Sequence, residues 1–599
     1  MGALGGDEHA DMEDISDYEL SHHVREALKA VVLGERGEYD QLIGNMHHTE
    51  HLVPDEVAML VTILRALTGA VSYIDVVHHR SLLSSICGMS LWNYGPDVMD
   101  ALVELVVALA ASNGKYVDLC LDMLVTNFIP PYNFLEILKQ PRGLAKKDQV
   151  IVRVHLALKG IADLVPLAPS RLEQIVRERV PNVLSKEAVS LTQQIVVYVE
   201  NMLKLESGDM GELVGNSMIF ELVNRLIDLD VEIGWDEILL DDPNSNKGIF
   251  EMELEDMARP TEMDMDEPEK EYSGRKVLWG NVVAQKLDTL MDLTFDHLQS
   301  CFKNGRLLQV FEALLQSFQS TVLTAYKSKF AQFIMFYACS LDPEDCGTQF
   351  VSKLLEIFRS TIYPHEWRMS AVAYLASYLS RAKLLSTSYV TIILESLVGW
   401  CYKYCKNQRG EVTPKNHRVF YAGCQAVMYV LCFRLRSILA TPQLKSQLLN
   451  MRLEQIFKHA LNPLEVCLPS IVEEFVRQAK AADVFVFDHL NESDASHAFG
   501  GFQRLDVFFP FDPYLLKKSD RFIRPNFIYW SMVRPTYEDD DDEDDDDVSV
   551  KDDEEVDDFD VNLSKMSITP KDSFMFGDHP QSRMQMPSRI RPSTSPESL

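Results

Sequence analysis

Two acidic blocks constrain this chain most, because neither can belong to a packed core. Residues 538–560 hold 17 acidic residues and one lysine, and residues 236–271 hold 14 acidic and three basic residues. Together the blocks carry 27 of the 33 net negative charges of the 599-residue chain. Such blocks repel themselves, stay solvated and often serve as interaction tails or loops. The remainder is nearly neutral, so the sequence predicts a scaffold with acidic appendages, which is typical of an interaction protein.

Apolar residues recur with the period of a helix on both sides of the first acidic block. One stripe has the spacing i, i+3, i+4 and i+7, which is the spacing of one helix face. Its members are Leu102, Leu105, Val106 and Leu109. Short breaks that contain proline or glycine separate such stretches, and strand-like alternation does not occur. We therefore expect helices arranged as antiparallel pairs in series.

The length of the chain decides between two all-α architectures. At 599 residues it exceeds one compact core and the size of an ordinary helical bundle. A degenerate array of helix pairs can reach this length, because each pair packs only on its neighbours. We therefore predict an all-α fold, a HEAT-like helical-repeat solenoid, with an irregular bundle as the alternative.

Composition divides the chain into six segments. In chain order they are a disordered acidic leader (1–15), N-terminal helical repeats (16–240), an acidic disordered loop (241–274), C-terminal helical repeats (275–482), an aromatic and proline-rich capping segment (483–536) and a disordered acidic tail (537–599). The capping segment contains FFPFDPY at 508–514, in which two prolines exclude a regular helix. We expect its rings to pack onto the last helices of the array.

The composition also excludes several locations and partners. The N-terminus is acidic, so we expect neither a secretory signal nor a transit peptide. We expect no membrane partner, because no uninterrupted apolar run approaches the ~20 residues that cross a bilayer. The ten cysteines stand singly in apolar stretches, which is typical of buried thiols in a reducing compartment. A net charge of −33 indicates weak or no autonomous binding to DNA.

Motifs for catalysis are missing or incomplete. The sequence contains no phosphate-binding loop, no dinucleotide-binding fingerprint and no nucleophile elbow. His365 and Glu366 begin the H-E-x-x-H motif of zinc proteases, but Met369 stands where the second histidine is required. We therefore expect that the protein is not an enzyme and needs no cofactor.

Two groups of potential metal ligands are better explained as structural residues. Cys401 and Cys405, with His417 downstream, lack the second matched pair of a structural zinc site and lie on one face of an apolar helix. We interpret both thiols as core cysteines and expect no metal. Three histidine doublets lack the spacing of a helical metal pair, and we interpret them as surface or helix-end residues. They are His22-His23, His47-His48 and His78-His79.

One basic cluster precedes the acidic tail. It consists of Lys517, Lys518, Arg521 and Arg524. Such a cluster is commonly a solvated face, and the alternative is a docking patch for an acidic partner or for the chain's own acidic tail. The tail itself offers candidate phosphorylation sites, at which phosphate would add charge without disturbing a fold. These candidates are Ser549, Thr569, Ser593 and Ser595.

Four sequence blocks in the C-terminal half are specific enough to indicate a family. They are YPHEWRMSAVAYLASYLSRAK at 363–383, FYAGCQAVMY at 420–429, LNPLEVCLPS at 461–470 and FFPFDPYLLK at 508–517. In this order they resemble the RNA polymerase I-specific transcription initiation factor family, the growth-regulated factors of TIF-IA type. The N-terminal half resembles the family only in its helical texture, acidic insertion and length.

The resemblance implies a fold, partners and a place of action. Members are HEAT-repeat solenoids of the nucleus and nucleolus that bind free RNA polymerase I, recruit it to the promoter-bound selectivity complex at ribosomal RNA genes, and are controlled by phosphorylation. The resemblance leaves open whether the free factor forms a homodimer. One block matches the region that the family uses for contact with the promoter complex. The same residues fit equally well an amphipathic helix that packs on its neighbours. Its residues are Leu379, Ser380, Arg381, Ala382 and Lys383, to which we add Lys517, Lys518 and Arg521 as partner-binding candidates.

Two other functions fit a helical solenoid. A transport or assembly adaptor of the armadillo or HEAT type would need a groove lined by regularly spaced tryptophan and asparagine, which six scattered tryptophans do not supply. A scaffold subunit of an enzyme complex, such as a phosphatase, is the second. A bridging factor is favoured, because a long solenoid offers two faces that can hold two large partners.

Overall fold

The structure, a computed structural model, describes residues 17–47, 53–181, 189–233, 281–325, 328–408, 413–485, 510–511 and 514–533. The predicted leader (1–15), acidic loop (241–274) and acidic tail (537–599) lie outside these residues, and so do the four candidate phosphorylation sites. The disorder of the three segments therefore stays a prediction.

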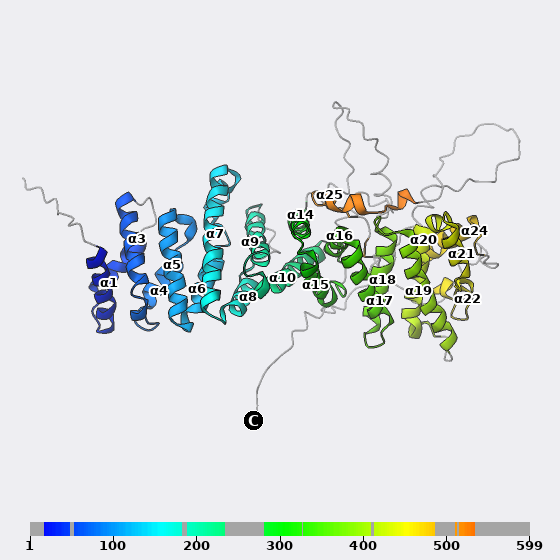
Figure 1. Cartoon of the computed structure of the whole chain (residues 1–599), viewed down its shortest axis with the longest axis horizontal. Helices are drawn as coiled ribbons and strands as arrows, with labels where there is room; N and C mark the ends of the chain where they lie inside the picture. Colours follow the sequence, from blue (N-terminus) through cyan, green and yellow to red (C-terminus); the bar gives the residue numbers. More distant parts are fainter. Residues whose placement is uncertain are drawn as a thin grey trace, which may run out of the picture.

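The described residues form one elongated row of helices (Figure 1). The helices before the first acidic block are α1 (Asp17–Val32), α2 (Gly37–His47), α3 (Pro54–Thr68), α4 (Arg80–Gly88), α5 (Pro96–Ser112), α6 (Val117–Thr126), α7 (Pro141–Leu164), α8 (Ala168–Arg179), α9 (Val189–Ser207) and α10 (Gly211–Glu232). Those after it are α14 (Val282–Lys303), α15 (Leu307–Ser317), α16 (Phe333–Leu341), α17 (Thr348–Arg359), α18 (His365–Arg381), α19 (Thr387–Asn407), α20 (Arg418–Leu439), α21 (Pro442–Asn450), α22 (Leu453–Phe457), α23 (Pro463–Val466), α24 (Pro469–Ala481) and α25 (Asp520–Ile523). The all-α prediction is confirmed, since β structure in the described residues amounts to an isolated bridge between Ala382 and Phe527.

Helices of the N-terminal half pack on the next helix but one along the chain. α5 packs between α3 and α7, and α6 packs on α8. α3, α5 and α7 each begin with a proline in the first turn, where the missing N–H removes no helical hydrogen bond. The stripe predicted on α5 is at most 1% exposed, so the periodicity identified the buried face. Its residues are Leu102, Leu105, Val106 and Leu109.

α20 is the central helix of the C-terminal half. It packs on α18, α19 and α24, and nearly all of its side chains are buried. The stretch Pro414–Leu439 is long and apolar enough to cross a membrane by length and composition, although 83% of its most apolar window is buried inside the array. A helix that is apolar all round and buried by its neighbours has the properties of a core helix.

The packing continues across the first acidic block, because α10 packs on both α14 and α15. Asp230, near the end of α10, is fully buried and accepts hydrogen bonds from the consecutive main-chain N–H groups of 329–331 at 2.8, 2.9 and 3.0 Å. The Ser328 hydroxyl donates to the same oxygen at 2.7 Å. A buried turn without such an acceptor would leave its N–H groups unsatisfied. Asp230 therefore fixes the start of α16 to the N-terminal half.

The last described segment, residues 510–511 and 514–533, is called the strap below. It lies along one side of the array over α14, α16 and α18 (Figure 1) and reaches α20, where the rings of Trp530 and Phe433 are 5.0 Å apart. The sequence predicted that this segment packs on the last helices of the array. In the structure the segment also packs on helices in the middle of the array. The reason is α16, whose side chains from 333 to 339 are all buried and need cover on more than one side.

Aromatic rings make the main contact between the strap and the array. The ring of Phe511 lies 5.3 Å from the ring of Phe333 and 5.3 Å from that of Phe336, both on α16. The ring of Tyr514 lies 4.8 Å from Phe333. Rings that meet in tilted or edge-to-face arrangements at these distances attract each other beyond the effect of area burial alone. The strap is thus part of the core of the C-terminal half.

Replacing Phe511 with alanine should destabilise the C-terminal half. Phe511 is fully buried, and truncation of a buried phenylalanine costs about 3–5 kcal/mol. We expect a lower midpoint in urea unfolding followed by circular dichroism. Met532→Ala, in the same strap but 49% exposed, is the control and should leave the midpoint unchanged. Equal midpoints for both variants would show that the ring of Phe511 is not needed.

The stability of the N-terminal half should fall in mild acid because of His155. This ring stacks on Phe128 with centroids 5.7 Å apart, and its Nε2 is 2.9 Å from Asn201 Oδ1. Burial lowers the pKa of His155 to about 4 from an ordinary value of 6.5. The unfolded chain therefore binds more protons between these values, and stability is lost as the pH falls from 6.5 toward 4. His155→Gln should show a shallower decline in urea titrations over this range, and an equally steep one would implicate another group.

Candidate partner-binding surfaces

The block that matches the promoter-contact region lies at the end of α18, and the structure encloses most of it. Lys383 is exposed. The other four residues are fully buried, and they are Leu379, Ser380, Arg381 and Ala382. In this arrangement only the Lys383 side chain of the block is open to a partner. The role of the block in partner binding stays a prediction.

The strap covers this block through its main chain. The Ile528 N–H donates to Arg381 O at 2.7 Å, and the Lys383 N–H donates to Asn526 O at 2.9 Å. These bonds lie on either side of the antiparallel bridge noted above. The last carbonyls of a helix have no partner within the helix, and here the strap supplies one. The block therefore holds the strap in register.

Two arginines stabilise the end of α18 from inside. Arg434, on α20, donates to Leu379 O at 2.9 Å and to Ala382 O at 2.6 Å. Burial lowers the pKa of Arg434 to about 10, so the side chain remains charged at neutral pH. The Arg381 guanidinium lies 4.5 and 5.1 Å from two phenylalanine rings, one on α20 and one in the strap. A positive charge at this position interacts favourably with the negative, C-terminal end of the α18 dipole.

The basic cluster of the strap is partly neutralised by α14. Lys518 Nζ and Arg521 Nη2 each lie 2.8 Å from the carboxylate of Asp292, which is buried. One turn earlier, Asp288 accepts from the main-chain N–H groups of Lys518 and Ser519 at 2.7 and 2.9 Å. Part of the cluster therefore joins the strap to α14. Its remaining members, Lys517 and Arg524, are exposed.

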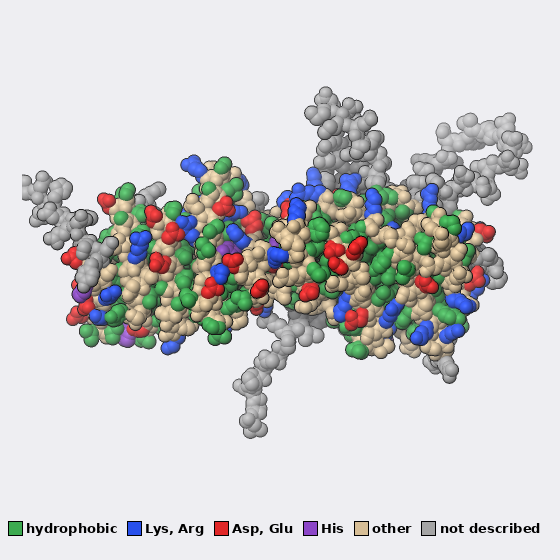
Figure 2. All heavy atoms as spheres, viewed as in Figure 1, with side chains coloured by type: hydrophobic (Ala, Val, Ile, Leu, Met, Phe, Trp, Pro, Cys, Tyr) green, Lys and Arg blue, Asp and Glu red, His purple; other side chains and the backbone are tan. Residues whose placement is uncertain are grey.

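A second basic surface was not indicated by the sequence. Lys and Arg side chains gather over α19 and α22 in Figure 2. Lys406 lies 4.8 Å and Arg452 lies 5.8 Å from the centre of the Tyr402 ring. Lys403 on α19 and Lys458, directly after α22, are exposed. These cations are separated by up to 55 positions along the chain. Only the packing of α19 on α22 brings them together.

The cysteines of α19 are core residues, as predicted. Cys401 and Cys405 are both buried free thiols. Burial raises the pKa of Cys405 to about 12, so this side chain is a neutral thiol. His417 does not join them, because its Nδ1 lies 2.9 Å from the hydroxyl of Tyr404. The arrangement fits core packing rather than a metal site.

His79 lies at a helix end, which is one of the two positions predicted for the histidine doublets. It is the N-cap residue of α4, and it is fully buried. Its Nε2 is 2.9 Å from Leu28 O, and its Nδ1 accepts from the Asp75 N–H at 3.1 Å. Both ring nitrogens have partners, which makes burial of the ring acceptable. The doublet residues that are exposed are His22, His23 and His78, and His48 lies outside the described residues.

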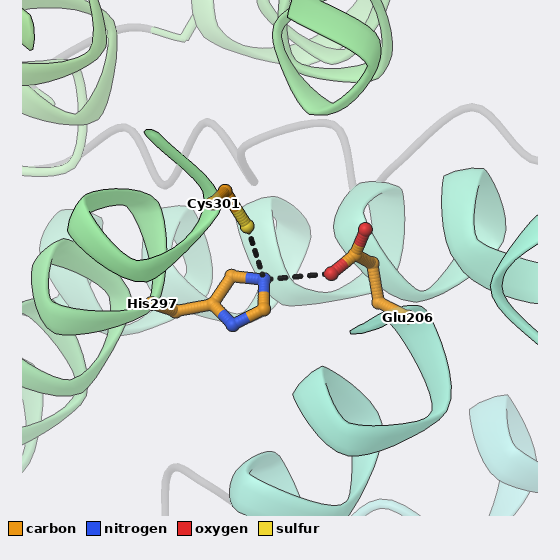
Figure 3. A group of neighbouring side chains, drawn as sticks. All are labelled: Glu206, His297 and Cys301. Atoms are coloured by element: carbon orange, nitrogen blue, oxygen red, sulfur yellow. Dashed lines mark hydrogen bonds and ion pairs between the residues drawn. The ribbon is translucent and has the colours of Figure 1, made fainter. Parts of the chain in front are cut away.

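The structure also brings together three side chains that the sequence did not connect (Figure 3). His297 and Cys301 lie one turn apart on α14, and Glu206 lies at the end of α9. His297 Nε2 is 2.7 Å from Glu206 Oε2 and 3.4 Å from Cys301 Sγ. Arg306, at the start of α15, pairs with the other carboxylate oxygen and donates to Glu206 O at 3.3 Å. The cluster joins the two halves of the array, because Glu206 lies before the first acidic block in the sequence and His297 and Cys301 lie after it.

Comparison with known proteins assigns the array and the strap to a family. The sequence model described as RNA polymerase I specific transcription initiation factor RRN3 matches residues 13–535. The chain belongs to the RRN3 family. The match includes both helical halves, the buried block at the end of α18 and the strap. The RRN3 family is one of transcription initiation factors and not of enzymes.

Individual relatives of the RRN3 family agree over most of their length. The RNA polymerase I-specific transcription initiation factor rrn3 of Schizosaccharomyces pombe is 27% identical over 515 residues, which cover 80% of this chain and 81% of the relative. The factor RRN3 of Mus musculus is 25% identical over 495 residues, 75% of this chain and 72% of the relative. The crystal structure of RNA Polymerase I Transcription Initiation Factor Rrn3 has a TM-score of 0.64 at 20% identity, and covers 87% of this chain and 100% of that one. The last comparison supports the fold.

Asp288→Ala should loosen the strap of this RRN3-family chain. The variant loses hydrogen bonds from two main-chain N–H groups to a charged acceptor, and bonds of this kind contribute about 1.5–3 kcal/mol. We expect faster trypsin cleavage after Lys517 and Lys518. Asp296→Ala is the matched control, because that exposed carboxylate has Arg521 at 3.4 Å and such a pair contributes at most ~1 kcal/mol. Equal cleavage rates in the two variants would contradict anchoring by Asp288.

Proposed function

We propose that this chain is an RNA polymerase I initiation factor that binds the polymerase and bridges it to the promoter-bound selectivity complex at ribosomal RNA genes. The observation that carries the proposal is the family match over residues 13–535, which spans the whole described array. The mechanism is differential binding, in which the factor stabilises a polymerase that can be recruited. The proposed place of action is the nucleus, and within it the nucleolus.

The shape of the array supports a bridging role. The row of helices is elongated in Figure 1, so its two halves expose separate surfaces along one array. α9, α10, α14 and α15 connect the halves through continuous packing. A solenoid of this kind presents long faces to large partners without rearranging its core. Neither the transport-adaptor nor the enzyme-scaffold alternative gains support from the family match.

The charges of the chain define how it should meet its partners. The net charge of −33 gives no general affinity for phosphate backbones, so recruitment to promoters is proposed to occur through proteins. On the C-terminal half, we propose Lys383, Lys517, Lys518 and Arg521 as the positive side of a partner contact. The buried residues of the 379–383 block hold the strap, which carries Lys517, Lys518 and Arg521. We further propose that the factor is regulated by phosphorylation, and Ser549, Thr569, Ser593 and Ser595 of the tail remain candidate sites for the modification.

Purified chain should retain RNA polymerase I in a pull-down at moderate salt after nuclease treatment. Lys383→Glu should lower recovery of the selectivity complex about tenfold or more, because a reversed charge at an interface places like charges together, while polymerase recovery stays unchanged. Lys445→Glu, an exposed lysine on α21, is the matched control and should leave both recoveries unchanged. Failure to retain polymerase would refute the proposed function, and retention with an unaffected Lys383→Glu variant would refute only the proposed contact.

A further inference from the structure

The junction between α9 and α14 contains a group of side chains that the proposed function does not use. Among the described residues, Glu206, His297 and Cys301 are the one group of three or more potential metal ligands whose donor atoms all lie within 4.8 Å of one another. In Figure 3 the His297 Nε2 faces both the carboxylate and the thiol, while Nδ1 points away from them. We propose that these three residues form a binding site for one divalent transition metal ion, with zinc as the best match.

The ligand set supports zinc. Imidazole nitrogen, thiolate sulfur and carboxylate oxygen are its three usual protein ligands, whereas magnesium and calcium prefer oxygen ligands alone. With Zn–N and Zn–O bonds of about 2.0–2.2 Å and a Zn–S bond of about 2.3 Å, tetrahedral ligands stand roughly 3.3–3.7 Å apart. The present separations are 2.7 Å from His297 Nε2 to Glu206 Oε2 and 3.4 Å from the same nitrogen to Cys301 Sγ. Side-chain rotations would therefore have to move the carboxylate about half an ångström away from the imidazole and keep it within reach of Cys301 Sγ, since all three donor atoms lie within 4.8 Å of one another.

The backbone holds the ligands close together before any ion arrives. His297 and Cys301 are four residues apart on α14, which places them on one helix face. Glu206 is held against α10, because Gly211 and Gly215 let the start of that helix approach it. A Cβ atom on Gly211 would lie 2.1 Å from Glu206 O, and one on Gly215 would lie 3.5 Å from Glu206 Cγ. The carboxylate is thereby fixed between three helices and is almost fully buried.

Arg306 determines on which side of Glu206 the ion would bind. Its guanidinium pairs with Oε1 and leaves Oε2 directed at His297. An outer partner on the second oxygen of a ligand is a common way to orient a carboxylate toward a metal. Arg306 also repels a cation, so the thiol must ionise to balance the ion. A divalent ion, one thiolate and one carboxylate are together neutral, and Arg306 adds one positive charge that solvent can reach because this side chain is partly exposed.

Metal binding should release a proton from Cys301. Cys301 is buried, and apolar surroundings favour the neutral thiol over the thiolate. Zn²⁺ replaces that proton, the sulfur lone pair forms the Zn–S bond, and the proton passes to solvent. The three protein ligands leave a fourth position for water. The bound ion would join α9 to α14 and thus the N-terminal half to the C-terminal half.

Cobalt(II) provides a direct spectroscopic test of the site in the full chain. The protein is stripped with a chelator, reduced, and titrated with Co²⁺ as the probe. We expect one equivalent to bind, with a thiolate-to-cobalt charge-transfer absorption and tetrahedral d–d bands, and we expect Zn²⁺ to displace it stoichiometrically. Cys301→Ser should abolish the charge-transfer absorption, and His297→Gln should weaken Zn²⁺ binding more than about 100-fold, beyond the 10–100-fold typical of outer-shell changes. Cys120→Ser, a buried thiol of α6, is the control and should keep the spectrum.

The test remains decisive if a variant folds poorly, because the wild-type protein carries two further readouts. Zn²⁺ should raise its unfolding temperature, since an ion that binds only the folded state stabilises that state. Binding should also weaken as the pH falls, because protons compete for the thiolate. Wild-type protein that takes up neither Co²⁺ nor Zn²⁺ at micromolar concentration, or that gives a cobalt spectrum without the thiolate band, would overturn the proposal. The cluster would then be a hydrogen-bonded link between the two halves alone.

Discussion

The contact of Phe511 with the two phenylalanines of α16 is the interaction on which the C-terminal half depends most. α16 is short and buried from residue 333 to residue 339, so its neighbours in the row leave one side to be covered. The strap covers that side and continues past the ends of α14 and α18 to α20. A linear array of helix pairs thus acquires a long-range contact that ordinary repeat proteins lack. The basic cluster, the α18 block and the last aromatic residues all take their positions from it.

Buried helix ends impose a second constraint, and arginine meets it repeatedly. Arg368 donates to Phe358 O at the end of α17, Arg434 donates to two carbonyls at the end of α18, and Arg306 donates to Glu206 O at the end of α9. A stack of short helices contains many such ends, and their carbonyls need donors when water is excluded. The two arginines of the family-like sequence blocks, Arg368 and Arg381, are both buried and are therefore structural. A positive charge in a sequence block is weak evidence for a partner contact in a fold of this kind.

Local patterns in the sequence predicted the helices and their buried faces, because helical periodicity is a property of neighbouring residues. The stripe on α5 and the core thiols of α19 followed from such patterns. The route of the strap, the burial of Arg381 and the surface around Tyr402 did not, since each depends on residues far apart in the chain. Glu206 and His297 are separated by 91 positions, and no spacing rule connects them. The burial of His79 was not indicated for the same reason, because its ring bonds to a carbonyl of α1.

The strap has a consequence for how the chain is made. Gln332 donates to Pro510 O across 178 positions, so α16 leaves the ribosome well before the residues that cover it. At roughly 5–20 residues per second, translation of that interval takes about 10–35 s. During this time the apolar surface of α16 has no native cover and is a target for chaperones or for aggregation. A nascent chain that stops before the strap would expose this surface permanently, whereas one that ends shortly after residue 533 would contain every contact described for the C-terminal core.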